Sequence, residues 1–113
     1  MTIHFGVLIP STNTTTEAEY SRLPPGYQAH YARVCTSTPG RPFSPGRDEE
    51  VEYQSQLLAT AKVRMIALLQ TSASLFDDDY DQVTMRRMSE AGGGVPSITS
   101  AHAVGRALRA LGA

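Results

Sequence analysis

The stretch Gly6–Glu17 reads GVLIPSTNTTTE and places a short apolar run directly before a cluster of small polar residues. The apolar run has the length and composition of a buried strand, and the proline after it ends the strand. In an open α/β sheet, ligands bind at the turns that follow the carboxyl ends of the strands. Backbone N–H groups and the dipole of the following helix favour an anion at such a turn. The stretch therefore predicts a carboxylate or phosphate site at the end of the first strand.

Strand and helix patterns alternate along the chain, which is typical of a parallel sheet with crossover helices. We expect strands over residues 3–9, 28–35, 65–69 and 95–99, and helices over 15–22, 48–62 and 80–91, with a last helix after residue 100. Residues 65–69 are apolar without interruption, so this strand should be central and buried on both faces. Right-handed crossovers then predict a flavodoxin-like α/β fold. Its parallel sheet has strand order 2-1-3-4 with helices on both faces, formed as one lobe by residues 1–113.

Three helix features lead to expectations about capping and packing. Thr14, followed three residues later by Glu17, matches a capping box at the start of the first helix. The second helix has an apolar stripe made of Val51, Leu57, Leu58 and Ala61. The last helix, with Ser100 as its cap, has a stripe at i, i+3, i+4 and i+7 made of Val104, Ala107, Leu108 and Leu111.

The composition of the chain argues against some classes of function. Its 113 residues suffice for one domain with a modest core. A net charge of −1 gives no electrostatic basis for binding nucleic acid or an anionic membrane, and no apolar run approaches a membrane-spanning length. Cys35 is the only cysteine, so no intrachain disulfide can form, and a reducing compartment, the cytoplasm, is the expected location.

A second polar turn follows the third expected strand and reads QTSAS over residues 70–74. The order 2-1-3-4 places the first and third strands side by side, so this turn and the one at residues 10–14 should face each other across one crevice. The hydroxyl and N–H groups of Thr71 and Ser72 could hold a carboxylate there. Taken alone, the first turn has a simpler interpretation, because Ser, Thr and Asn are also the usual caps of a helix N-terminus.

These segments resemble the aspartate/glutamate racemase superfamily, in its maleate cis-trans isomerase and arylmalonate decarboxylase branch. The resemblance covers nearly the whole chain and is carried by residues 6–17, 27–34, 65–74 and 94–112. It implies an enzyme of two similar α/β lobes that enclose a small carboxylic or dicarboxylic acid, of which this chain is the N-terminal lobe. It also implies proton transfer at a carbon beside a carboxylate, without a cofactor.

The resemblance further implies roles for particular residues. Asn13 would hold a substrate carboxylate, Thr71 and Ser72 would form an anion pocket, and the turn at Ser11 and Thr12 would supply donors. Gln70 occupies the position where a catalytic cysteine of the first lobe is expected. An amide does not ionise near neutral pH, so Gln70 cannot act as a thiolate base or nucleophile.

The identity of the catalytic residue is therefore open, and so is enzymatic activity. Gln70 favours a decarboxylase-like site with one cysteine from the second lobe over a two-cysteine racemase or isomerase. The sequence ends at Ala113, before any second lobe, so a piece of a longer protein and a half-sized protein that pairs as a homodimer both fit. The alternative function is a non-catalytic anion-binding or regulatory module.

The remaining reactive side chains have structural interpretations. Cys35 is expected to be a small buried core residue, and His4 and His30 lie on strand patterns. His102, in the first turn of the last helix, could approach the crevice. The acidic run at residues 77–81 lacks the glycine and distal glutamate of a calcium loop, so we expect it to lead into a helix N-terminus and predict no metal site.

Overall fold

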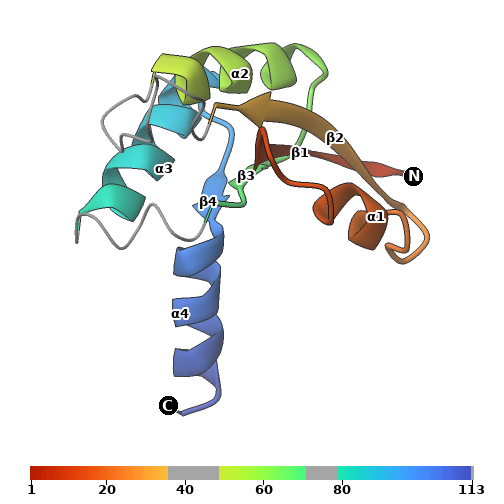
Figure 1. Cartoon of the computed structure of the whole chain (residues 1–113), viewed down its shortest axis with the longest axis vertical. Helices are drawn as coiled ribbons and strands as arrows, with labels where there is room; N and C mark the ends of the chain where they lie inside the picture. The colour runs from red at the N-terminus through yellow and green to blue at the C-terminus, as the bar shows by residue number, and fades with distance from the viewer. Residues whose placement is uncertain (36–48, 71–78, 113) are drawn as a thin grey trace.

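The structure is a computed structural model that describes residues 1–35, 49–70 and 79–112. Its helices and strands follow the expected alternation (Figure 1). In chain order they are β1 (Ile3–Pro10), α1 (Thr16–Tyr20), β2 (Tyr27–Val34), α2 (Glu49–Thr60), β3 (Ile66–Leu68), α3 (Tyr80–Ala91), β4 (Ser97–Thr99) and α4 (Ser100–Ala110). The bounds of α3 agree with the sequence pattern, whereas β3 and β4 are shorter than expected.

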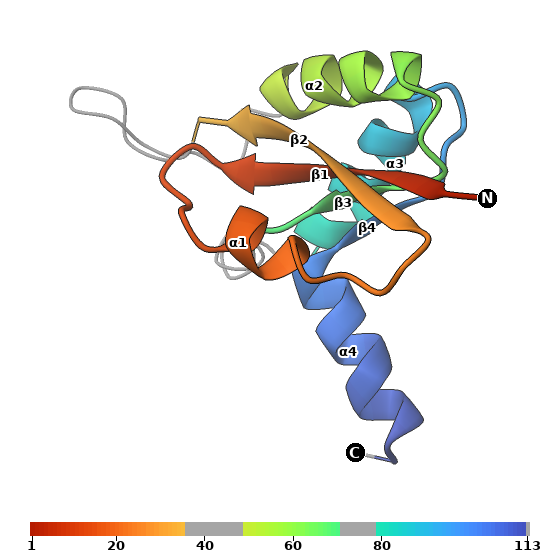
Figure 2. The same ribbon diagram turned by 90° about the vertical axis from the view of Figure 1, so that its right-hand side faces the viewer.

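The sheet has four parallel strands in the order β2-β1-β3-β4, which confirms the predicted fold class. β1 pairs with β2 along its whole length, from Ile3 opposite Tyr27 to Pro10 opposite Val34. β3 pairs with β1 through Leu68 opposite Leu8, and all of its residues are buried, as expected for a central strand. Helices α2 and α3 cover one face of the sheet, while α1 and α4 lie on the other side (Figures 1 and 2).

The main hydrophobic core lies between the sheet and the layer formed by α2 and α3. Its buried members are Leu8, Val34, Val51, Leu58, Val63, Ile66, Leu68 and Met88. Gly6 allows the close contact of β1 with α2, because a Cβ atom at this position would lie 2.9 Å from Leu58 Cδ1. The strand that carries the first polar turn is therefore anchored directly in this core.

The apolar stripe of α2 differs from the predicted one. Leu57 is 46% exposed, whereas Ser55 is fully buried and donates from Oγ to the carbonyl of Val51 at 2.8 Å. Val51, Ser55 and Leu58 share the buried face, since a helix turns about 100° per residue and position 57 then points about 120° away from position 51. Ala61 lies beyond the end of the helix and is exposed.

The last helix also departs from its expected packing. Thr99, not Ser100, is the N-cap residue, and its Oγ1 accepts from the backbone N of His102 at 3.2 Å. No residue of α4 is buried, and its main contact is with β4, the strand that it follows directly. Both views show α4 extending away from the sheet (Figures 1 and 2). The predicted stripe on this helix is therefore present, but none of its residues is buried.

Candidate functional site

The candidate site lies at the edge of the sheet where the parallel strands end. Leu8 of β1 pairs with Leu68 of β3, and the backbone N of Leu69 donates to the Leu8 carbonyl at 2.9 Å. Pro10 and Gln70 each follow this pair by two residues. The two polar stretches thus leave adjacent strands at the same edge of the sheet.

The turn after β1 is held by backbone hydrogen bonds and is open to solvent. The N–H of Ser11 donates to the Val34 carbonyl at 2.7 Å, and that of Asn13 donates to the Pro10 carbonyl at 2.9 Å. Ser11 and Thr12 are exposed, while Asn13 is half-buried. This geometry leaves the turn accessible to a small anion.

Asn13 itself caps α1, and the predicted capping box is wrong. Its Oδ1 accepts from the backbone N of Thr15 at 3.2 Å and from that of Thr16 at 3.0 Å. The N-cap residue is Thr15, whose side chain makes no capping hydrogen bond. The helix begins too late for Thr14 and Glu17 to have the spacing of a capping box. The side-chain oxygen of Asn13 therefore has the structural role of a helix cap. The side-chain nitrogen takes no part in the cap.

Arg33 of β2 also holds this turn in place through hydrogen bonds to its carbonyls, a role that the sequence did not predict. Its Nη1 donates to the carbonyls of Asn13 at 2.7 Å, Ser11 at 3.2 Å and Pro10 at 3.4 Å. Its Nη2 lies 3.4 Å from Oε1 of Glu17 in α1. Arg33 therefore joins β2, the turn and α1, and places a positive charge beside the candidate anion site. The one available signal was its position in β2, two residues after Tyr31 on the same face.

The contact between α1 and the sheet is aromatic. The rings of Phe5 and Tyr20 are 6.1 Å apart between centroids.

Burial raises the pKa of the Tyr31 hydroxyl above its usual value, and Glu17 and then Tyr20 raise it further. The Tyr31 hydroxyl therefore ionises less readily than that of a tyrosine free in water.

Gln70 is the most unusual polar residue at this edge. It is only 7% exposed, and its Nε2 has no hydrogen-bond partner among the described residues. A buried amide nitrogen without a hydrogen-bond partner lowers the free energy of unfolding by about 1–3 kcal/mol. Thr71 and Ser72, the next predicted site residues, lie outside the described residues.

The same edge continues at β4. Thr99 is buried, and its Oγ1 donates to Oδ1 of Asp81 in α3 at 2.6 Å. His102 is half-buried in the first turn of α4. Residues 77 and 78 of the acidic run lie outside the described residues, whereas Asp79 is the N-cap residue of α3. In the described part of the chain, no group of three or more His, Cys, Asp or Glu residues is placed to hold a metal ion.

The lone cysteine and the strand histidines have structural environments. Cys35 is half-buried, not buried as predicted, because it lies one residue past β2, where its backbone N donates to Oε1 of Glu50 at 2.9 Å. His4 and His30 lie on neighbouring strands, with Nδ1 of the first 2.9 Å from Nε2 of the second. Each ring thus has a partner within the protein.

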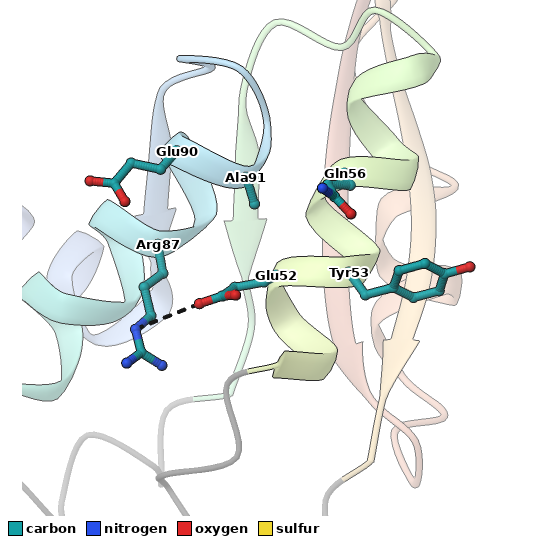
Figure 3. Close-up of a pocket in the computed structure, with 6 residues that line it drawn as sticks. All are labelled: Glu52, Tyr53, Gln56, Arg87, Glu90 and Ala91. Carbon is teal, nitrogen blue, oxygen red and sulfur yellow. Dashed lines mark ion pairs between the residues drawn. The ribbon is translucent and has the colours of Figure 1, made fainter.

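A shallow hollow of about 300 Å³ lies between α2 and α3, away from the strand ends (Figure 3). It is lined by Glu52, Tyr53, Gln56, Arg87, Glu90 and Ala91. Arg87 and Glu52 point toward each other across it with 3.6 Å between Nε and Oε1, while the ring of Tyr53 points away from α3 (Figure 3). Its charged lining residues Arg87 and Glu52 are already paired with each other, so this hollow is a weaker candidate than the strand edge.

Comparison with known proteins gives a match by structure and none by sequence. No protein-family model matches the chain, and no curated protein matches it significantly. No helix in the described residues is long and apolar enough to cross a membrane.

The structural neighbours include maleate isomerase and arylmalonate decarboxylase. The maleate isomerase Iso from Pseudomonas putida S16 superposes with a TM-score of 0.79 at 23% identity, over 99% of this chain and 50% of that chain. Unliganded arylmalonate decarboxylase superposes with a TM-score of 0.76 at 25% identity, over 98% of this chain and 48% of that chain. The chain thus has the aspartate/glutamate racemase-like α/β fold and spans about half the length of the enzymes that it matches.

Proposed function

We propose that residues 1–113 form one lobe of a cofactor-independent isomerase, racemase or decarboxylase that acts on small carboxylic or dicarboxylic acids. The neighbours support the fold of such a lobe, and their names include maleate and an arylmalonate, both dicarboxylates. The buried amide of Gln70, at the strand edge beside the polar turn, is the observation that carries the proposal.

The chemistry of that edge favours a carboxylate. The Nε2 group of Gln70 is a donor without an acceptor, and a carboxylate is an acceptor that can take several hydrogen bonds. The turn at Ser11, Thr12 and Asn13 offers further donors, and the guanidinium of Arg33 adds positive charge. In this proposal Thr71 and Ser72 complete the anion pocket.

The proposed lobe binds substrate but does not supply the base. Gln70 stands where the family resemblance places a cysteine, and an amide neither donates nor removes a proton at neutral pH. Proton transfer then requires a group from outside residues 1–113, either in a second lobe or in another copy of the chain. A non-catalytic anion-binding or regulatory module is the alternative function, because Gln70 would serve it equally well.

Calorimetric titration of the purified chain with maleate and with an arylmalonate tests the proposed binding. Replacing Gln70 by Leu keeps the volume and removes the donor, so binding should weaken by about 1–3 kcal/mol. Because the same change removes a buried amide nitrogen that has no hydrogen-bond partner among the described residues, the free energy of unfolding should stay the same or rise.

Two controls make this titration specific. Gln56→Leu makes the same substitution at an exposed position of α2 and should leave binding unchanged. Dimethyl maleate has the skeleton of maleate without its charge and should not bind. Equal affinity of Gln70→Leu and the unmodified chain for maleate, or no binding by the unmodified chain, would contradict the proposed site.

A further inference from the structure

Helix α4 exposes a continuous apolar seam. Val104 is 56% exposed, Leu108 50% and Leu111 83%, and Ala101 continues the line toward the start of the helix. These four positions follow one another at intervals of three, four and three residues, which is the spacing of the seam of a coiled coil. We call these four residues the α4 seam.

A helix of this length needs a packing partner. Isolated helices shorter than about 12–15 residues are marginal in water, and α4 has 11 residues. Its main contact is with β4 at its beginning, and the rest of the helix extends away from the sheet (Figures 1 and 2). The exposed seam is the surface against which a partner can pack.

The residues around the seam favour an identical helix as that partner. The positions that flank it are small and uncharged: Ser100, Gly105, Ala107 and Gly112. The basic side chains Arg106 and Arg109 lie on the opposite face of the helix, together with His102. Two copies of α4 can therefore approach through the seam without bringing like charges together.

We propose that two copies of this chain associate through α4, with the two helices antiparallel about a two-fold axis near residue 106. In that register Leu108 faces the partner's Val104, and Leu111 faces the partner's Ala101. Each leucine thus meets a smaller residue, which is how interdigitating side chains fill an interface. Gly105 lies beside the partner's Gly105 near the axis and permits close approach of the helices. A two-fold interface of this kind is self-complementary, and the antiparallel helix dipoles attract each other.

The size of the neighbours supports a second copy as the occupant. This chain covers 50% of the maleate isomerase chain, so a second copy supplies a polypeptide as long as the part that is not matched. Helix α4 lies on the same side of the sheet as α1, which begins at the candidate site (Figure 2). The inference deepens the proposed function in this respect and rests on it, because a partner on this side would help to enclose the bound acid.

Sedimentation equilibrium of the full chain without ligand, over a concentration series from low to high micromolar, tests the interface. The apparent mass should rise with concentration from that of the 12.2 kDa monomer to twice that value. Leu108→Lys places a charge in the seam and should hold the chain at the monomer mass throughout the series. Ala110→Lys adds the same charge on the other side of the same helix and should leave dimerisation unchanged.

Circular dichroism melting of each variant separates the interface from folding. Both substituted positions are exposed in the monomer, so at a low micromolar concentration, where the unmodified chain is also monomeric, all three proteins should melt at the same temperature. A monomeric mass for the unmodified chain at all concentrations would overturn the proposal, as would equal dimerisation of the two variants. So would a lower melting temperature of monomeric Leu108→Lys, since that result would mean that α4 packs on its own sheet. Maleate titration of monomeric Leu108→Lys tests the binding site separately, because Gln70 and the β1 turn are unchanged in it.

Discussion

At the scale of single residues, two buried polar groups behave in opposite ways. The Oγ1 of Thr99 donates to Asp81 and accepts from the backbone N of His102, so its burial is fully compensated. The Oγ1 of Thr84 in α3 is fully buried and has no hydrogen-bond partner among the described residues. A threonine hydroxyl thus stabilises the fold at position 99 and destabilises it at position 84.

This contrast predicts opposite effects of the same substitution. Thr84→Val removes an unpaired hydroxyl at constant volume, so it should raise the free energy of unfolding by about 1 kcal/mol. Thr99→Val removes two hydrogen bonds and a helix cap, so it should lower that free energy by about 1–2 kcal/mol. Urea denaturation followed by circular dichroism measures both. A loss of stability in Thr84→Val would mean that its hydroxyl has a partner.

At the scale of secondary structure elements, the start of α1 depends on Asn13. Its amide oxygen caps two backbone N–H groups of the helix, while its own carbonyl is held by Arg33. Thr14, which the sequence pattern favoured as the cap, is exposed. The candidate site and the helix cap therefore share one residue.

The shared residue gives a prediction that separates Asn13 from its neighbour. Asn13→Ala should lower the free energy of unfolding by about 1 kcal/mol, the usual cost of losing an N-cap side chain. Thr14→Ala should change it by less than about 0.5 kcal/mol, as expected for an exposed position. Denaturation of the two variants side by side measures the difference, and equal losses would restore Thr14 as a cap.

At the scale of the whole molecule, the edge that we propose to bind an anion has no cysteine at the position where the resemblance places one. Its only cysteine, Cys35, follows β2, at the outer strand of the sheet, and its backbone contacts α2. Gln70 holds the central position after β3. Binding and chemistry are therefore expected to separate in this chain.

This separation predicts that the purified chain does not exchange the α-proton of its ligands. Aspartate and glutamate incubated with it in D₂O should show no deuterium incorporation by NMR beyond that of a sample without protein. Gln70→Cys should not racemise aspartate or glutamate, because the second group needed for two-sided proton transfer is still missing. Robust exchange by the unmodified chain would mean that one of its own residues acts as the base.

The sequence alone determined the order of elements, the parallel sheet with strand order 2-1-3-4, and the placement of two polar stretches after β1 and β3. These features follow from local periodicity and from the handedness of crossovers, both of which are properties of contiguous segments. Periodicity does not identify which of several neighbouring polar residues has the geometry to cap a helix. In this chain the capping side chain is that of Asn13 and not that of Thr14.

Only the tertiary structure decided which contacts join distant segments. Arg33 reaches a turn that lies 20 to 23 residues earlier, because β2 and β1 pair in a particular register. The same packing buries Ser55 in place of Leu57 and leaves Nε2 of Gln70 without a hydrogen-bond partner in the described residues. The stripe on α4 was visible in the sequence, but its exposure was not, because burial depends on which other surface meets a helix and not on the pattern of the helix itself.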